Sequence, residues 1–174
     1  MKRVHVFMAM SLDGFIAGPN DELDWLHREG VDDTFTPFME GVGALLMGRR
    51  TYDVAAGFEG PWPYGETPVL VATTRSLQVA RGVVTPVSGS IAALLERAKD
   101  AAGDRDVYLD GGVLIRAALD AGLVDALTLT VIPTVLGAGV SLWAGGTQRH
   151  ELTLLGTEEI GGGLVQLRYV PARP

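Results

Sequence analysis

Four short segments of this sequence combine glycine, hydroxyl and charged side chains in patterns that could bind a phosphorylated ligand. Each segment follows a short apolar run of the kind that forms a buried strand. Ligands of open α/β sheets gather at the carboxyl ends of strands, so we expect the four segments at one edge of a sheet. The segments are Gly48-Arg49-Arg50-Thr51, Thr73-Thr74-Arg75-Ser76, Asp110-Gly111-Gly112 and residues 10–20.

The first segment stands where the apolar run 43–48 gives way to a helical pattern. Gly48 would let a phosphate approach the backbone, and the first turn of the helix offers unpaired N–H groups. An arginine beside those donors binds phosphate oxygens through parallel hydrogen bonds. The alternative is an ordinary strand-to-helix turn with solvated arginines.

The segment Asp110-Gly111-Gly112 also opens a helix. Two adjacent glycines permit close passage of a pyrophosphate over the N–H groups of Val113 and Leu114. A complete G-x-G-x-x-G fingerprint is absent from this place, and a tight turn between strand and helix explains the glycines equally well.

The two remaining segments are more ambiguous. Thr73, Thr74 and Arg75 could receive a second phosphate, although threonine is common at strand ends. Residues 10–20 contain two strong turn signals, Asp-Gly and Gly-Pro-Asn. They form either a mobile loop over a pocket or a plain surface connection.

Runs rich in valine and leucine alternate along the chain with helical patterns, which predicts parallel strands joined by crossover helices. The strand-like runs are VHVFMAM, GALLMG, PVLVATT, GVVTPV, DVYLDGG and DALTLTVIP. Near the C-terminus, ELTLLGTEEI and LVQLRYV are separated by three glycines, which predicts a closing antiparallel hairpin.

Two helices can be placed from a cap and from apolar spacing. Ser90 is expected to cap the first helix, whose apolar face is Ile91, Leu94, Leu95 and Ala98. The second helix follows Gly112, and its predicted apolar face is Val113, Leu114, Ala117 and Ala118.

The composition indicates one globular domain over residues 1–174, with no repeat, linker or composition break. The formal net charge of −7 would repel nucleic acid and anionic membranes, so neither is an expected partner. Residues 126–146 carry no charge, but Pro133 and several glycines favour a strand that runs into a loop over a membrane span. His5 and Asp13 interrupt the N-terminal apolar stretch, so we expect no export signal.

The chain has no cysteine, which excludes disulfides, thiolate nucleophiles and Cys-ligated zinc and suits a cytoplasmic location. His5, His27 and His150 are far apart in sequence, without metal-ligand spacing, so no metal is expected. His5 alternates with the valines of the first strand, which favours an edge position or a hydrogen-bonded core residue over a catalyst.

The motifs occur in the order A-M-S-L-D-G-F-I-A, M-G-R-R-T-Y, V-A-T-T-R, a Gly-Gly turn into a helix, and L-T-L-T-V-I-P. This order resembles the dihydrofolate reductase superfamily over about 170 residues. The phrases MSLDGFIA and LDGGVLIRAALDAGLVDALTLTVIPTVLGAG are most similar to the reductase domain of the bifunctional deaminase-reductase of riboflavin synthesis and to its stand-alone relatives.

The resemblance implies a three-layer α/β fold with a mostly parallel central sheet, flanking helices and a C-terminal antiparallel hairpin. It also implies a homodimeric NADPH-dependent reductase of a small-molecule substrate. The chain lacks the zinc deaminase signature, so it would perform only the reductase half of the bifunctional enzyme.

The resemblance assigns many of the motif residues to NADPH, and arginine is independently the natural partner of its 2′-phosphate. Arg49 is the first choice for that contact and Arg50 the second. Gly48, Arg49 and Thr51 would hold the adenosine side and the phosphates, with Thr73, Thr74 and Arg75 near the 2′-phosphate, Gly111, Gly112, Val113 and Leu114 under the pyrophosphate, and Ala9 and Ile16 beside the nicotinamide.

A proton must accompany the hydride in such a reduction. The folate enzymes supply a carboxylate at the start of the helix before M-G-R, and Asp32 occupies that place here, with Asp33 next. Either aspartate could instead form a cap or a turn, and Pro37 favours a helix that Thr36 caps. Thr130 matches the threonine that orients substrate in the family, although a strand threonine needs no functional reason.

The loop FEGPWPYGETPVL contains no basic residue, whereas the folate enzymes carry there an arginine that binds the glutamate tail of folate. We therefore favour a small nitrogen heterocycle or a ribosylamino-pyrimidine over dihydrofolate. Trp62 and Tyr64 could wall an aromatic pocket or pack on the surface. A phosphoribosylamino substrate would need its own phosphate site, for which Arg28 and Arg116 are candidates. The alternatives are a pterin or dihydrofolate reductase, and a non-catalytic nucleotide-binding or scaffolding domain.

Overall fold

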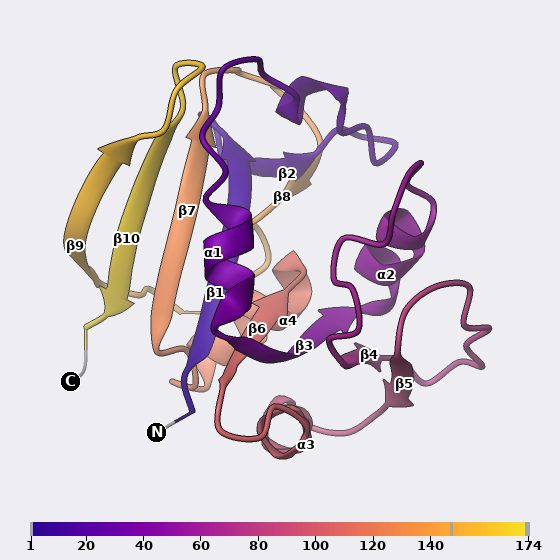
Figure 1. Cartoon of the computed structure of the whole chain (residues 1–174). Coiled ribbons are helices and arrows are strands. Elements are labelled where there is room, and N and C mark those ends of the chain that lie inside the picture. Colours follow the sequence, from indigo (N-terminus) through magenta and orange to yellow (C-terminus); the bar gives the residue numbers. More distant parts are fainter. Residues whose placement is uncertain (1, 147, 173–174) are drawn as a thin grey trace.

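A twisted eight-stranded sheet runs through the computed structural model, which describes residues 2–146 and 148–172 (Figure 1). The strands of the described residues are β1 (Val4–Ser11), β2 (Phe15–Ala17), β3 (Val42–Gly48), β4 (Val69–Ala72), β5 (Val84–Val87), β6 (Asp106–Asp110), β7 (Ala126–Ile132), β8 (Val140–Ser141), β9 (Leu152–Glu159) and β10 (Val165–Pro171). Of these, β2 and β8 form a separate two-stranded sheet. The α-helices are α1 (Phe35–Glu40), α2 (Arg49–Ala56), α3 (Ile91–Ala101) and α4 (Gly112–Asp120), and a short 3-10 helix spans Asp24–Leu26.

The strand order is β5-β4-β3-β6-β1-β7-β10-β9. The first six strands in this order are mutually parallel, and β10 runs antiparallel to both β7 and β9. Parallel strands of this kind are buried on both faces, which accounts for their continuous valine and leucine runs. The predicted mostly parallel sheet with a C-terminal antiparallel hairpin is therefore confirmed.

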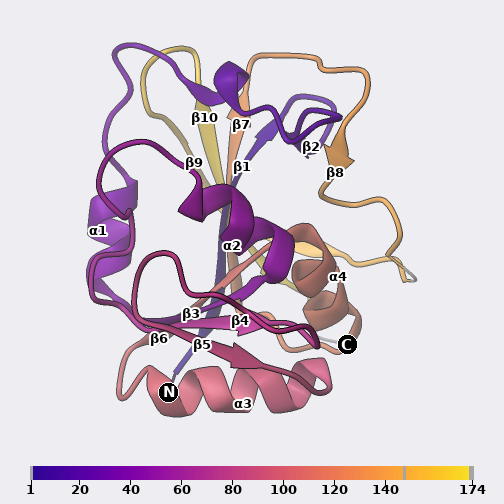
Figure 2. The same ribbon diagram turned by 90° about the vertical axis from the view of Figure 1, so that its right-hand side faces the viewer.

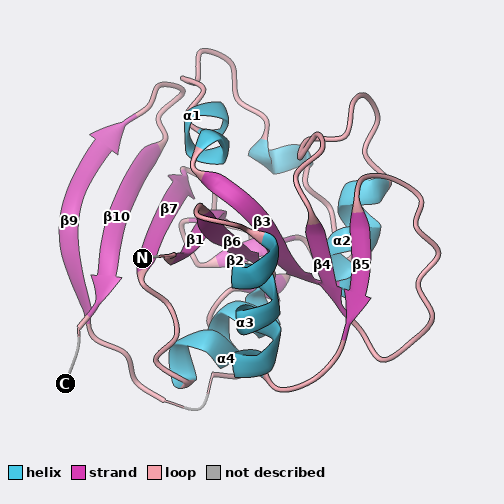
Figure 3. Cartoon of the chain, turned by 60° about the horizontal axis from the view of Figure 1, so that its bottom comes forward, coloured by secondary structure: helices cyan, strands magenta, loops and turns pink. Residues whose placement is uncertain are grey.

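Alternate side chains of the central strands pack into two separate cores. Leu46 and Leu109 belong to the core beneath α3 and α4, whereas Leu45 and Tyr108 belong to the core beneath α1 and α2. Figure 2 shows α1 and α4 on opposite sides of β1, and Figure 3 shows α3 beside α4 on one face of the sheet. Helices therefore cover both faces, which confirms the predicted three layers. Because Asp110 is two residues after Tyr108 on β6, it is directed to the α1 and α2 side.

The cap of α3 is confirmed, because the Ser90 hydroxyl accepts a hydrogen bond from the Ala93 N–H. In α4 the predicted apolar face is confirmed in part, because Ala118 is buried and Leu114 packs against the core, but it is wrong for Val113, which is 72% exposed. Helix α4 begins at Gly112, two residues after the end of β6. The position of this first residue determines which side chains of the helix face the sheet. The buried side chains of α4 are Ile115, Ala118 and Leu119. No helix within the described residues is long and apolar enough to cross a membrane.

Helix α1 begins at Phe35, earlier than the start that Pro37 predicts. The Asp33 carboxylate accepts hydrogen bonds from the N–H groups of Phe35 and Thr36, at 3.1 and 2.9 Å. Asp33 thus satisfies the first donors of the helix, a role that the sequence assigns to Thr36. Pro37 is tolerated in the first turn because N–H groups there have no partner inside a helix.

Candidate active site

The carboxyl ends of β3, β4 and β6 bring three of the predicted segments to one edge of the sheet. Met47 pairs with Asp110 and Gly48 pairs with Ala72, so these strands end side by side. A cavity of about 580 Å³ opens at this edge. The predicted residues that line it are Ala9, Ile16, Gly48, Arg49, Arg50, Thr51, Gly111, Gly112, Val113 and Leu114. The sheet therefore gathers most of the predicted cofactor residues around one cavity.

Two glycines form the part of the wall where α4 begins. Gly111 has a φ of 97°, which side chains rarely allow, and a Cβ there would lie 2.7 Å from Thr51 Oγ1. A Cβ on Gly112 would lie 3.0 Å from Arg116 Nη1 and 3.4 Å from Ile16 Cδ1. Only glycine fits these close approaches without a shift of its neighbours. The backbone of the first helical turn is therefore left bare at the cavity, in a form that suits an anion.

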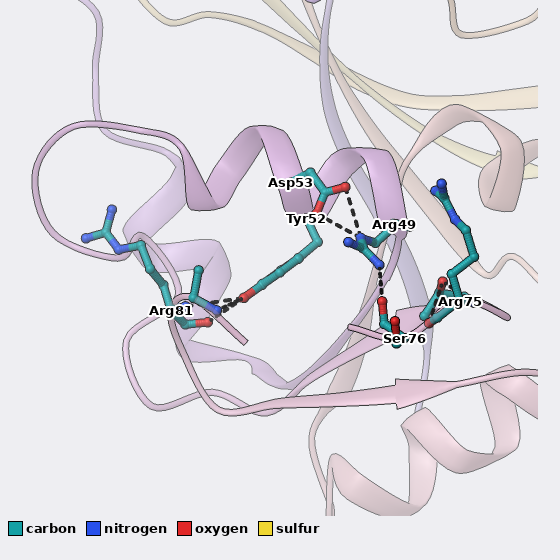
Figure 4. A network of polar contacts seen from close by, with 8 residues as sticks. Arg49, Tyr52, Asp53, Arg75, Ser76 and Arg81 are labelled. Atoms are coloured by element: carbon teal, nitrogen blue, oxygen red, sulfur yellow. Dashed lines mark hydrogen bonds and ion pairs between the residues drawn. The ribbon is translucent and has the colours of Figure 1, made fainter. Parts of the chain in front are cut away.

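Arg49 lies at the start of α2 and already has polar partners on two sides (Figure 4). Its Nε donates to the two carboxylate oxygens of Asp53 at 2.8 and 2.9 Å, and its Nη1 donates to the Ser76 carbonyl oxygen at 2.9 Å. The Ser76 contact ties α2 to the segment after β4. Arg50 binds Asp21 instead, through Nε at 3.0 Å and Nη2 at 2.7 Å.

Thr73, Thr74 and Arg75 lie beyond the end of β4 and are not among the described residues that line the cavity, whereas Ala72 is. The Thr73 hydroxyl accepts a hydrogen bond from the Arg75 N–H at 3.1 Å. Figure 4 shows the Arg75 guanidinium without a dashed contact to the other residues drawn. The structure therefore places this segment at the side of the site, next to the Ser76 carbonyl that Arg49 binds.

Asp110 ends β6 as a buried carboxyl on the cavity wall. Its Oδ2 lies 3.3 Å from the Tyr108 hydroxyl, which lies 2.9 Å from the Phe7 carbonyl oxygen. One hydroxyl hydrogen cannot serve both oxygens, and the shorter distance favours Phe7. A protonated Asp110 completes both contacts by donating to Tyr108. Burial raises the pKa of Asp110 to about 6, although a hydrogen bond from the Gly111 N–H and the contact with the Tyr108 hydroxyl oppose the shift.

The two predicted catalytic residues, Asp32 and Thr130, are not among the described residues that line the cavity. Asp32 is exposed, and its N–H donates to the Ile160 carbonyl oxygen at 2.7 Å, beside the C-terminal hairpin. Thr130 is buried in β7, where its Oγ1 accepts a hydrogen bond from Gln166 Nε2 at 3.2 Å. The same nitrogen lies 3.0 Å from Thr34 Oγ1, so Thr130 helps to connect β7 and β10 to the start of α1.

Aromatic side chains from four separate segments line the same cavity. They are Phe7, Phe35, Phe58, Tyr64 and Tyr108. The Phe35 ring is central, because its centroid lies 5.9 Å from that of Phe7, 6.3 Å from that of Tyr64 and 6.5 Å from that of Tyr108. Of the two aromatic candidates in the proline-rich loop, Tyr64 walls the cavity, and Trp62 packs against Tyr64 with centroids 5.0 Å apart.

The motifs single out few of these aromatic residues, although part of the signal is present in the sequence. Side chains alternate between the two faces of a strand, so Tyr108 and Asp110 of DVYLD point to the same face. An aspartate at the end of an otherwise apolar, buried strand is unusual and suggests a functional role. Phe35 and Phe58 carry no such signal. Their places depend on how α1 and the loop after α2 return to the sheet.

The small two-stranded sheet of β2 and β8, called the β2–β8 flap here, covers one side of the cavity. Its residues on the cavity wall are Ile16, Ala17 and Val140. Asp13 holds the approach to the flap, because its carboxylate accepts hydrogen bonds from the Ser11 hydroxyl at 2.6 Å and from the N–H groups of Leu136 and Gly137 at 3.1 and 2.8 Å. Residues 10–20 therefore form a hydrogen-bonded cover over the cavity.

His5 has a structural environment. Its Nε2 lies 2.9 Å from Thr128 Oγ1, and its ring meets that of Phe38 edge-on with centroids 5.0 Å apart. Burial and the nearby Arg3 charge lower the pKa of His5 to about 4, so the ring is neutral near pH 7. The predicted role of a hydrogen-bonded core residue is confirmed.

Residues 2–166 match the family model of the RibD C-terminal domain. YwjB of Bacillus subtilis (strain 168) is 31% identical over 173 residues, which cover 98% of this chain and 99% of YwjB. Among solved structures, a protein of Shewanella sp. PV-4 that is assigned to riboflavin biosynthesis has a TM-score of 0.87 at 34% identity, with 98% of this chain and 99% of that chain covered.

Two more distant structures show the same fold. The diaminohydroxyphosphoribosylaminopyrimidine deaminase/5-amino-6-(5-phosphoribosylamino)uracil reductase of Thermotoga maritima has a TM-score of 0.74 at 16% identity, over 98% of this chain and 57% of that one. Dihydrofolate reductase of Enterococcus faecalis, complexed with NADP(H), has a TM-score of 0.66 at 17% identity, over 98% of this chain and 97% of that one. The family match spans nearly the whole chain, and the protein therefore belongs to the RibD C-terminal domain family, with a dihydrofolate reductase-like fold.

Proposed function

We propose that this protein is an NADPH-dependent reductase that transfers a hydride to a small nitrogen heterocycle. The observation that carries the proposal is a single cavity that is lined by residues 48–51 and 111–114, by Asp110 and by five aromatic rings. Apolar clefts of this size with a few convergent polar groups are typical of ligand sites. Membership of the RibD C-terminal domain family and the NADP(H) complex of the Enterococcus protein support the class of cofactor.

Residues 48–51 and 111–114 fit a phosphorylated dinucleotide. Gly111 and Gly112 leave the space that a Cβ would fill, beside the N–H groups that open α4, and we assign the pyrophosphate to this place. Gly48 and Thr51 face it from the start of α2. Ala9 on β1 and Ile16 on the β2–β8 flap line the same cavity, and we assign them to the nicotinamide. When bound, NADPH would supply the hydride.

We assign the 2′-phosphate to Arg49, with Arg50 as a second cation at the start of α2. The Arg49–Asp53 ion pair is partly exposed, and such pairs contribute about 0.2–1 kcal/mol. A charged hydrogen bond to phosphate contributes roughly 1.5–3 kcal/mol, so Arg49 can exchange Asp53 for the phosphate. Because the Arg49–Ser76 bond brings the segment after β4 to the start of α2, we keep Thr73, Thr74 and Arg75 as further contacts.

We assign to Asp110 the role of donating the proton that accompanies hydride transfer. Its carboxyl is buried on the cavity wall and retains a proton up to about pH 6, whereas Asp32 is exposed and lies away from the cavity lining. A buried carboxylic acid with a raised pKa suits general acid catalysis. Tyr108 is a positioning residue, because its hydroxyl joins Asp110 to the Phe7 carbonyl oxygen.

Titration with NADPH and with NADH, followed by nicotinamide fluorescence, tests the cofactor. We expect tighter binding of NADPH, and Arg49→Ala should narrow the preference by about 10- to 100-fold, because one charged contact is lost. Arg97→Ala, which removes an exposed arginine of α3, is the matched control and should leave the preference intact. Equal affinity for the two cofactors would reject the assignment.

Turnover separates the reductase from a binding module. If NADPH binds but is not oxidised with any pterin, aminopyrimidine or quinone-like acceptor, a non-catalytic nucleotide-binding domain explains the site better.

A homodimer and a cytoplasmic location are also part of the proposal. Sedimentation of the purified chain tests the homodimer.

A further inference from the structure

We infer, on the basis of the proposed reductase function, that the substrate is a planar heterocycle that carries no phosphate group. It would occupy the part of the cavity that aromatic rings line, called the aromatic chamber here. The chamber is defined by Phe7, Phe35, Phe58, Tyr64, Tyr108 and Asp110. Three properties of this chamber carry the inference: its ring surfaces, its single ionisable group and the hydrogen bonds that engage each arginine among the described cavity-lining residues.

The ring surfaces suit a flat ligand. Tyr64 and Tyr108 meet at 67° with centroids 6.4 Å apart, and Phe35 meets each of them at a similarly steep angle. Steeply inclined rings offer both faces and edges to a planar ring placed among them. Phe58, 43% exposed, lines the cavity from the loop that follows α2. A planar heterocycle can therefore contact several aromatic rings at once.

The described residues that line the cavity include three cations, and all three lie outside the chamber. Arg49 and Arg50 stand at the start of α2, where Asp53 and Asp21 pair with them. Arg116, which the sequence offers as a phosphate site, lies on α4. Its Nη1 donates to two carbonyl oxygens, of Ser141 at 3.1 Å and of Leu142 at 2.9 Å.

The acidic groups of the chamber and of its loop would repel a phosphate. Asp110 is the ionisable carboxyl within it, and once it is ionised, above about pH 6, a phosphorylated substrate would place like charges together in a low-dielectric cavity. The loop that carries Phe58 and Tyr64 adds two exposed acids, Glu59 and Glu66, and has no lysine or arginine. A neutral heterocycle meets none of this repulsion, and its N–H groups or ring nitrogens can bond to Asp110.

Two further arginines have hydrogen-bond partners outside the cavity lining. Arg81 donates to the carbonyl oxygens of Phe58 and Gly60, and so holds the loop from outside the cavity lining. Arg28, the other phosphate candidate of the sequence, donates to the His27 carbonyl oxygen at 2.9 Å and to Thr134 Oγ1 at 2.7 Å. Neither side chain lines the cavity within the described part of the chain.

The test compares ligands that differ only in the phosphate. The probes are 5-amino-6-(ribosylamino)uracil and its 5′-phosphate, with 7,8-dihydropterin as an unphosphorylated reference. Quenching of intrinsic fluorescence would give each dissociation constant, with and without saturating NADP⁺, so that no turnover occurs. We expect the nucleoside to bind at least tenfold more tightly than its phosphate. Equal affinity, tighter binding of the phosphate, or failure of all three probes to bind at 1 mM would overturn the inference.

This design separates the inference from the proposed function. If NADP⁺ fails to bind while the nucleoside is still preferred in the cofactor-free protein, the reductase proposal fails and the chamber specificity stands. If NADP⁺ binds and the phosphate is preferred, the inference alone fails.

A gain of function gives a second readout. Phe58→Arg places a cation at the exposed side of the chamber and should shift the nucleoside-to-phosphate affinity ratio toward the phosphate by about tenfold, the effect of one charged contact. Phe58→Leu, which alters the ring without adding charge, should leave the ratio within about threefold of wild type. An unchanged ratio in Phe58→Arg would show that the charge of the chamber does not set the preference, and would overturn the inference.

Discussion

The Tyr108 hydroxyl lies 3.3 Å from Asp110 Oδ2 and 2.9 Å from the Phe7 carbonyl oxygen, so a single phenol joins the cavity carboxyl to strand β1. Burial also raises the pKa of Tyr108, which keeps the hydroxyl protonated and available as a donor. This arrangement holds Asp110 in one orientation. It also stores a proton at the cavity wall below about pH 6.

Asp110→Asn is expected to slow hydride transfer by about 100-fold or more at pH 6, because general acids contribute roughly 10²–10⁴ in rate and an amide cannot supply the proton. In the wild type, kcat/KM should fall about tenfold per pH unit above about pH 6, as the acid form is depleted. Stopped-flow oxidation of NADPH from pH 5 to pH 8 measures both effects.

Asp32→Asn is the direct comparison, since the sequence points to that carboxyl, and Asp104→Asn is an exposed control. NADPH affinity should stay nearly constant in all three variants. A larger loss of rate in Asp32→Asn than in Asp110→Asn would identify Asp32, and not Asp110, as the proton donor.

The pH dependence of stability should contain two opposing contributions. The pKa of Asp110 is raised on folding from 3.8 to about 6, so its contribution to stability is present at low pH and is lost as the pH rises toward 6. The pKa of His5 is lowered from 6.5 to about 4, so its contribution is present above pH 6.5 and is lost as the pH falls toward 4. In the wild type these two slopes nearly cancel between pH 4 and 6.

In Asp110→Asn the His5 contribution is no longer opposed by Asp110, and from pH 4 to pH 6.5 the free energy of unfolding should rise by about 3 kcal/mol more than it does in the wild type. His5→Gln should show the reverse slope over the same range. Urea unfolding at half-unit pH steps measures both. Parallel pH profiles for Asp110→Asn and the wild type would contradict the raised pKa of Asp110.

Gly111→Ala is expected to weaken NADPH binding by at least about tenfold. The new Cβ would meet Thr51 Oγ1 at 2.7 Å and would force α2 and α4 apart at the place assigned to the pyrophosphate. Gly103→Ala is the matched control, because Gly103 also has a positive φ, of 62°, but a Cβ there meets nothing within 4 Å.

Each of these two alanines should cost roughly 1–2 kcal/mol of stability through the backbone conformation alone. Fluorescence titration with NADPH and thermal unfolding separate the two effects. Unchanged NADPH affinity in Gly111→Ala would contradict the assignment of the pyrophosphate to the start of α4.

Asp13→Asn should loosen the β2–β8 flap. The carboxylate receives hydrogen bonds from Ser11, Leu136 and Gly137, and an amide offers only one acceptor oxygen in place of two. Hydrogen exchange at the Leu136 and Gly137 amides should accelerate about tenfold, because part of their protection comes from these bonds. Exchange in Asp104→Asn should match the wild type, and equal exchange in Asp13→Asn would show that the carboxylate does not hold the loop.

Local patterns predict a large part of this fold. Valine-rich runs, the Ser90 cap and the three glycines of the C-terminal hairpin specify elements from a few neighbouring residues, and the structure confirms the sheet, the layers and the hairpin. Where two local signals compete, prediction is weaker. Pro37 points to one start of α1, while the Asp33 carboxylate supports an earlier one.

The sequence by itself determined which segments end strands and open helices, because backbone freedom at Gly111 and strand periodicity act over a few residues. It therefore placed the phosphate-binding candidates at one sheet edge. Only the tertiary structure decided that Asp110 lies inside the cavity while Asp32 lies outside, and that Phe35 and Phe58 complete an aromatic wall. These outcomes depend on strand order and on the return of distant loops to the sheet. Packing between remote segments sets such arrangements, and no short window of sequence contains them.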